Sequence, residues 1–173
     1  MERANSTAFK EQVFIGAVVL QGLHFVEHIA QVTQKFFLKL PEAHGILGAA
    51  LDTEWVHFTY NLALLALLWA LVFAYGLHRR DTCRNQPRSY LSILAFTAGV
   101  QLYHMIEHSV KLAQHLVEGC GSCPGLLGAV VELAWLHFSI NLAILALMAL
   151  ASAGFALSSI STKPTPAHDT ISA

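Results

Sequence analysis

Histidine and glutamate recur in one close pattern at two places in an otherwise apolar sequence. The pattern His-x-x-Glu-His occupies residues 24–28 and again residues 104–108. On an α-helix this spacing puts the three side chains within an arc of about 100°. Neutral imidazole is the commonest metal ligand in proteins, and a nearby carboxylate compensates the charge of the ion. Each copy of the pattern therefore predicts part of a transition-metal site.

A further histidine follows each copy at the same distance along the chain. His57 and His137 each precede an asparagine by four residues, so the histidine and the asparagine share one helix face. We expect these two histidines to complete the donor set of each copy. The predicted metal ligands are His24, Glu27, His28, His57, His104, Glu107, His108 and His137. They are enough for two ions, which either lie close together or are held separately by the two copies.

Imidazole with carboxylate suits iron, zinc or copper, whereas calcium and magnesium prefer sites made of oxygen alone. We expect iron first, with zinc or copper as alternatives. Four amide side chains accompany the donors, namely Gln21, Asn61, Gln101 and Asn141. They are expected to bind and orient the metal ligands through hydrogen bonds. Hydrogen bonding between helices alone would also explain them.

The polar residues belong to an internal repeat with an offset of 80 residues, as in 24 and 104. The matched pairs include Gln21 and Gln101, His24 and His104, Glu27 and Glu107, His28 and His108, Gly45 and Gly125, His57 and His137, and Asn61 and Asn141. Shared apolar composition does not explain these matches, because such polar residues are rare inside membrane helices. The repeat predicts two similar two-helix units.

The elements that would position these residues are four apolar stretches. They cover residues 13–30, 55–77, 90–110 and 133–157, and about 20 apolar residues suffice to cross a bilayer. The predicted fold is an all-α membrane protein, a four-transmembrane-helix bundle made of two tandem two-helix repeats in the same orientation. Facing polar arcs would bring the donors of both repeats together in the outer half of the bundle.

The chain divides into an N-terminal segment (1–12), repeat 1 (13–77), an Arg-rich loop (78–89), repeat 2 (90–157) and a disordered tail (158–173). Arginine and lysine concentrate in the segments before, between and after the repeats. Because short basic loops stay inside, both termini are expected in the cytoplasm, and the membrane is expected to be a bacterial cytoplasmic membrane. The pair Cys120 and Cys123 would then lie outside, where a local disulfide is favoured over a zinc half-site.

Composition supports the membrane assignment. Of the 173 residues 55% are hydrophobic and 12% charged, while ten are histidine. Soluble domains carry about 25% charged residues, and disordered chains combine low hydrophobicity with high net charge. A net charge of −1 without a basic stripe excludes a nucleic-acid binder as well.

The predicted function is an integral membrane metal protein with a dinuclear site and redox chemistry of the oxidase or hydroxylase type. Its partners would be the lipid bilayer, a quinone or lipid substrate, and a larger membrane complex or further copies of the chain. The alternative functions are transport of a transition metal, a metal-holding accessory subunit, a bis-His haem b protein, and a proton relay without metal. Haem is disfavoured because Glu27 and Glu107 would lie beside the macrocycle.

Overall fold

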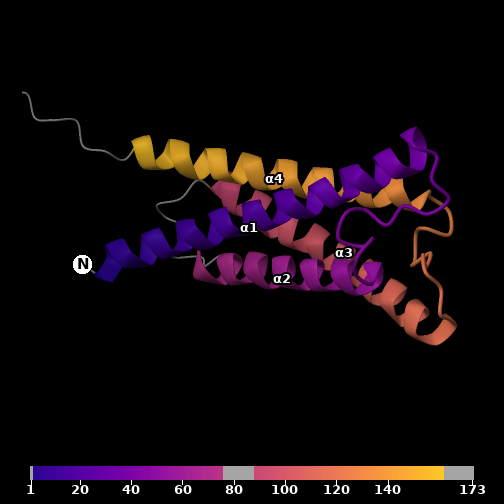
Figure 1. Cartoon of the computed structure of the whole chain (residues 1–173). Coiled ribbons are helices and arrows are strands. Elements are labelled where there is room, and N and C mark those ends of the chain that lie inside the picture. The colour runs from indigo at the N-terminus through magenta and orange to yellow at the C-terminus, as the bar shows by residue number, and fades with distance from the viewer. Residues whose placement is uncertain (1, 76–87, 162–173) are drawn as a thin grey trace, which may run out of the picture.

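Four long helices make up the computed structural model, which describes residues 2–75 and 88–161. They are α1 (Glu2–Val32), α2 (Thr53–Ala74), α3 (Arg88–Glu118) and α4 (Leu133–Ser161), and a short π-helix η1 (Thr33–Phe37) continues α1. Successive helices run in opposite directions (Figure 1). The segments 38–52 and 119–132 therefore lie at the same end of the bundle, which we call the loop end. In the described residues the fold is all-helical, as predicted.

Each helix packs against two neighbours. α1 contacts α2 and α4, and α3 contacts the same two helices from the other side. The first hairpin (α1–α2) and the second hairpin (α3–α4) thus meet along both of their helices. A site built on the inward faces can draw side chains from all four helices.

The bundle is polar inside and apolar outside over much of α1. Ile15, Val19 and Leu23 are each more than half exposed. Gln21 and His24, on the opposite face of the same helix, are buried. This arrangement is the reverse of a soluble helix and suits a lipid environment, in which polar side chains turn toward the protein interior.

Three helices are long and apolar enough to cross a membrane: Phe9–Phe37, Thr53–Ala74 and Leu133–Ala153. α3 is not among them, because the buried polar residues Gln101, His104, Glu107 and His108 lower its mean hydropathy. The length and composition of the described helices therefore agree with a membrane protein, with three clear spans where four were predicted.

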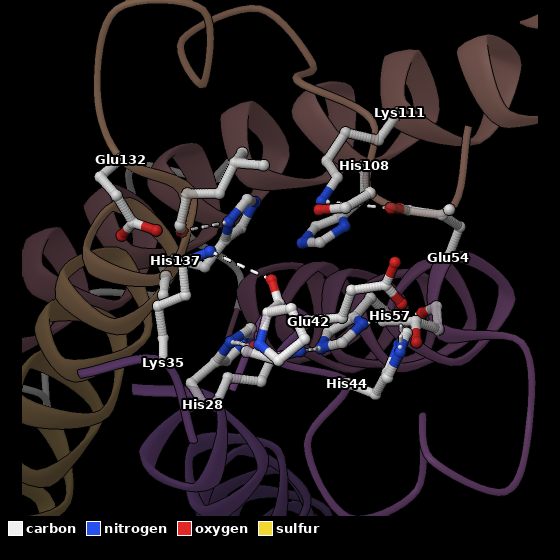
Figure 2. Close-up of a pocket in the computed structure, with 18 residues that line it drawn as sticks. His28, Lys35, Glu42, His44, Glu54, His57, His108, Lys111, Glu132 and His137 are labelled. Atoms are coloured by element: carbon white, nitrogen blue, oxygen red, sulfur yellow. Dashed lines mark hydrogen bonds and ion pairs between the residues drawn. The ribbon is translucent and has the colours of Figure 1, made fainter. Parts of the chain in front are cut away.

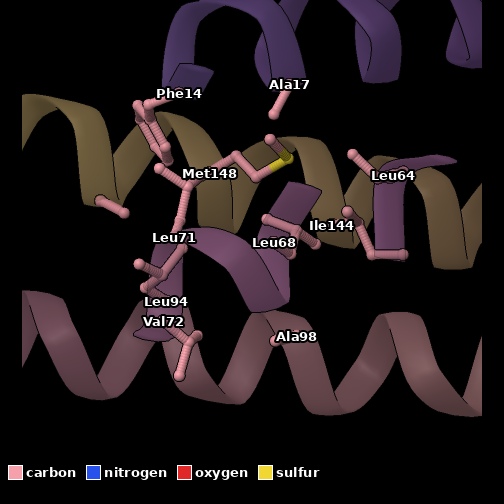
Figure 3. Packing of buried hydrophobic residues seen from close by; sticks show 11 residues of the cluster. Phe14, Ala17, Leu64, Leu68, Leu71, Val72, Leu94, Ala98, Ile144 and Met148 are labelled. Carbon is pink, nitrogen blue, oxygen red and sulfur yellow. The ribbon is translucent and has the colours of Figure 1, made fainter. Parts of the chain in front are cut away.

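The half of the bundle away from the loop end is filled by apolar side chains, which we call the apolar core (Figure 3). Leu64, Leu68 and Leu71 of α2 lie at its centre and expose at most 2% of their surface. Ile144 and Met148 of α4 pack against them and are fully buried. The core also includes Phe14, Ala17, Val72, Leu94, Ala98 and Ala151. It fixes how the helices align and leaves the polar residues to the other half.

The helices extend beyond the predicted stretches. α1 begins at Glu2, inside the segment 1–12 that was expected to precede it, and η1 carries the helix on to Phe37. α3 continues to Glu118 and α4 to Ser161. Most of the Arg-rich loop 78–89 and of the tail 158–173 lies outside the described residues.

Candidate metal centre

Six buried histidines, contributed by all four helices, gather between the apolar core and the loop end. They are His24, His28, His57, His104, His108 and His137, and none exposes more than 3% of its surface. We call them the histidine cluster. The structure thus brings together every histidine that the sequence proposed as a ligand.

Within each hairpin, two histidines one turn apart face each other through their Nε2 atoms. These atoms are 3.2 Å apart in His24 and His28, and 3.1 Å apart in His104 and His108. Two imidazoles on one ion, each bound at about 2.0–2.1 Å, have nitrogens about 2.9–3.4 Å apart. Both pairs therefore have the spacing of two ligands of a single metal ion.

The cluster also crosses from one hairpin to the other. The ring of His57 stacks on that of His108, with centroids 5.4 Å apart and an angle of 4° between the planes. His28 stacks on His137 at 5.8 Å and 12°. The imidazoles of the two hairpins therefore form one continuous group.

Backbone carbonyls set the tautomers of the two histidines at the starts of α2 and α4. His57 donates from Nδ1 to Thr53 O at 2.8 Å, and His137 donates from Nδ1 to Leu133 O at 2.9 Å. A carbonyl oxygen only accepts, so each neutral ring carries its proton on Nδ1. The lone pair is then on Nε2, which is ready to bind a metal.

Three imidazoles of the second hairpin are close enough to hold one ion. A ligand atom from each of His104, His108 and His137 lies within 4.8 Å of the others. We call this group the α3–α4 triad. Nδ1 of His104, Nδ1 of His108 and Nε2 of His137 are buried without a hydrogen-bond partner. An unpaired buried nitrogen is costly, so an ion bound at Nε2 of His137 would stabilise this arrangement. An ion between the paired Nε2 atoms of His104 and His108 would leave their Nδ1 atoms unpaired.

A cavity of about 170 Å³ opens on the loop-end side of the cluster (Figure 2). His28 and His57 lie across it from His108 and His137. Its charged lining residues are Lys35, Glu42, Glu54, Lys111 and Glu132. The cavity has room for several water molecules and joins the histidine cluster to polar surroundings.

A buried ion pair lies in this cavity. Lys111 Nζ is 3.3 Å from Glu54 Oε1, and both side chains are at least nine-tenths buried. Glu54 Oε2 has no partner. The carboxylate thus neutralises the lysine beside the triad and keeps one oxygen free.

Glu27 and Glu107, which the sequence proposed as metal ligands, are used differently. Glu27 Oε1 accepts hydrogen bonds from the backbone N–H groups of Ile46, Leu47 and Gly48 at 2.9–3.1 Å. Glu107 Oε1 accepts from the backbone N–H groups of Leu126 and Leu127 at 3.0 and 3.3 Å. Each carboxylate holds the turn that follows its own helix, because clustered amide donors attract negative charge.

The matched glycines explain why these turns can approach the glutamates. Gly45 and Gly125 have positive φ angles of 81° and 69°, which glycine adopts at little cost. A Cβ at either position would overlap Oε1 of Glu27 or Glu107. Gln34 also bonds Gly45, accepting from its N–H and donating to its carbonyl, both at 2.8 Å.

The four amides expected to orient the imidazoles instead join helices below the cluster. Gln21 donates from Nε2 to the backbone O and to Oδ1 of Asn141, at 3.1 and 3.0 Å. Gln101 makes the same pair of bonds to Asn61, at 3.1 and 2.9 Å. These bonds connect α1 with α4 and α3 with α2, and thus hold the two hairpins in register.

His115 of α3 braces the loop end. His115 donates to Cys120 O at 2.7 Å, and its Nε2 is 2.9 Å from Asp52 Oδ2. Cys120 forms a disulfide with Cys123, as the spacing favoured. Asp52 also caps α2, since it accepts from the backbone N–H of Glu54 and Trp55.

Sequence reasoning did not assign roles to Gln31 and Lys111, which occupy equivalent positions in the repeat. Gln31 Oε1 accepts from His28 Nδ1 at 2.7 Å, and Gln31 Nε2 lies 3.4 Å from His57 Nε2. Lys111 pairs with Glu54 instead. The sequence does show that the two repeats differ at this position, which lies on the buried polar face of the helix. That difference is the signal from which a special role could have been predicted.

Comparisons of the chain with protein-family models, with curated proteins and with solved structures found no match. The chemistry of the site therefore carries the functional argument.

Proposed function

We propose that this chain is an integral membrane protein that binds two transition-metal ions in the histidine cluster and uses them for redox chemistry of the oxidase or hydroxylase type. The observation that carries the proposal is the set of six buried, mutually contacting imidazoles. Their paired Nε2 atoms have the spacing of shared ligands. Apolar side chains would stabilise a bundle at least as well as a buried polar cluster does, so the cluster calls for a ligand.

Iron is our first choice of metal, with zinc or copper as alternatives. Neutral imidazole binds all three, so the donor set alone does not separate them. Iron and copper supply redox chemistry when bound, and zinc does not. Glu54 lines the same cavity as His108 and His137 and pairs with Lys111, and its free Oε2 is a candidate oxygen ligand.

For the membrane arrangement we propose four spans, with α3 as the fourth, in two tandem hairpins of the same orientation. The Gln–Asn pairs and the Glu-held turns occur at equivalent positions in both hairpins, which supports a duplicated unit. The polar residues of α3 are buried, so their charge and hydrogen-bonding groups would not meet lipid. Both termini would be cytoplasmic and the cavity would open outside, in a bacterial cytoplasmic membrane.

The apolar core favours a resident ion over an ion in transit. From Leu64 to Leu71 the centre of the bundle is filled with buried aliphatic side chains, a distance of about 10 Å along the helix. Among the described residues, the apolar core offers a metal ion no imidazole, carboxylate or thiolate on that path, whereas the cavity reaches the cluster from the loop end. Metal transport therefore needs a second conformation, and a fixed site does not.

Haem is a poorer fit. A bis-His haem needs a flat space between two imidazoles for the macrocycle. In the cluster, the rings of His104 and His108 are 4.8 Å apart, and those of His108 and His137 4.7 Å. Inserting a porphyrin would separate histidines that now touch. The small polar cavity likewise favours a small substrate over a quinone or a lipid tail.

Metal content and the optical spectrum of the detergent-purified protein test the proposal. We expect elemental mass spectrometry to find two irons per chain. The optical spectrum should show charge-transfer bands and no Soret band. Exchangeable zinc or copper would favour transport, and a fixed ion in a stable larger assembly would favour an accessory subunit. A Soret band, or a protein without metal after growth in supplemented medium, would refute the proposal.

A further inference from the structure

We infer that the two hairpins bind metal unequally, and that the α3–α4 triad (His104, His108 and His137) takes the first ion. The first hairpin has the equivalent histidines, but Gln31 occupies the lone pair of one of them. The inference rests on the metal-binding function proposed above. It makes Gln31 and Lys111 the residues that set the order of binding.

The difference begins with two histidines in the same tautomer. His57 and His137 both donate from Nδ1 to a backbone carbonyl. In each ring Nε2 is therefore the only lone pair that can bind a metal. The tautomer therefore gives neither His57 nor His137 an advantage in binding an ion.

The residue at the matched position one turn beyond the His-x-x-Glu-His pattern makes them unequal. In the first hairpin it is Gln31, whose Nε2 donates toward His57 Nε2 at 3.4 Å while its Oε1 accepts from His28 at 2.7 Å. An ion that binds His57 must first displace this amide. In the second hairpin the residue is Lys111, which turns to Glu54, and His137 Nε2 has no partner.

The spacing of the ligand atoms points the same way. Among the described residues, the triad is the group of histidines whose ligand atoms lie within 4.8 Å of one another. His108 and His137 of the triad also line the cavity through which an ion would arrive. The Nε2 lone pair of His137 is therefore free, and the triad's three ligand atoms are within reach of one ion. In the first hairpin the corresponding lone pair of His57 accepts from Gln31, and this contact is what makes the two hairpins unequal.

Matched alanine variants of the two histidines test the order of binding. Metal-free full-length protein in detergent is titrated with Co²⁺, whose visible absorption reports imidazole ligands, and bound cobalt is counted after desalting. We expect His137→Ala to abolish the tighter binding step and His57→Ala to leave it in place. Equal loss of that step in both variants overturns the inference. Absence of Co²⁺ binding by the unaltered protein would instead refute the proposed function.

Two substitutions at Lys111 separate hydrogen bonding from charge. Lys111→Gln and Lys111→Met both remove the positive charge beside the site, which by electrostatics alone would tighten Co²⁺ binding equally. Only glutamine can donate to His137 as Gln31 donates to His57. One hydrogen bond is worth roughly a fivefold change in affinity, so we expect Lys111→Gln to bind Co²⁺ about fivefold more weakly than Lys111→Met. Equal affinity of the two variants would overturn the role assigned to position 31.

The reciprocal change is made in the first hairpin. Gln31→Met removes the amide from His57 and keeps a side chain of similar length. We expect the second Co²⁺ ion to bind about fivefold more tightly, by the same single hydrogen bond, while the first step stays unchanged. A weaker second step would contradict the inference, since it would mean that Gln31 supports the ligand rather than blocks it.

Discussion

The use of Glu27 as a loop anchor predicts that neutralising it destabilises the fold without removing metal. In Glu27→Gln the side chain keeps one acceptor oxygen but loses its charge. It also places an NH₂ group where Oε2 now accepts from Leu47 N at 3.1 Å. A hydrogen bond to a charged group is worth about 1.5–3 kcal/mol and a neutral one about 1 kcal/mol.

Glu107→Gln is the matched control, because the second copy holds its turn by fewer bonds. Glu27 binds three backbone N–H groups, and Glu107 binds two, the second at 3.3 Å. Oε2 of Glu107 has no partner, so an NH₂ group there meets no opposing donor. Losing the charge assistance should cost about 2 kcal/mol at Glu27 and about 1 kcal/mol at Glu107.

The assay is thermal unfolding of metal-free protein, followed by the fluorescence of Trp55, Trp69 and Trp135. For a chain of this size about 1 kcal/mol corresponds to about 2–4 °C in Tm. Glu27→Gln should therefore melt roughly twice as far below the unaltered protein as Glu107→Gln does. Both variants should keep the full metal content. Loss of metal from Glu27→Gln with an unchanged Tm would refute this reasoning and restore Glu27 as a ligand.

Two further predictions concern the loop end. Gly45→Ala should lower Tm, because alanine at φ 81° costs about 1–2 kcal/mol and its Cβ displaces the carboxylate of Glu27. Gly22→Ala is the control: nothing lies within 4 Å of a Cβ at that position, so this variant should not lower Tm. The carbonyl of Cys120 and the carboxylate of Asp52 raise the pKa of His115. This stabilisation is present below the ordinary pKa of histidine and is lost as pH rises through the raised value. The difference in Tm between the unaltered protein and His115→Gln should thus be larger at about pH 6 than at about pH 9, and a pH-independent difference would contradict it.

Periodicity and spacing in the sequence were enough to predict which histidines meet. The polar residues of α1 fall on one arc, and a polar arc on an otherwise apolar helix can only be satisfied inside a bundle. His24 and His104 are buried as that argument requires. The matched positions in the two hairpins then place both sets at the same depth.

The roles of the glutamates could not be predicted in this way. The helix positions of Glu27 and His28 differ by one residue, and an arc drawn from the sequence treats both as inward-facing donors. What separates them is the path of segment 38–52, which folds back so that its N–H groups reach Glu27. The matched Gly45 carried the missing information, because a repeated glycine indicates a turn with positive φ or a close approach.

The difference in metal binding between the hairpins depends on one position, Gln31 in the first and Lys111 in the second, at which the two repeats do not match. Aligning the two copies emphasises what they share, and the shared histidines and asparagines suggest two equal sites. Gln31 and Lys111 differ, and each directs its polar end to a different partner, one to the histidines and one to Glu54. In the described residues, apolar side chains fill the other half of the bundle, and the cavity that Lys111 and Glu54 line is the route by which we propose that an ion reaches the cluster. Lys111 and Glu54 thus line this cavity and leave Nε2 of His137 without a hydrogen-bond partner. The second hairpin is therefore where we expect metal chemistry to begin.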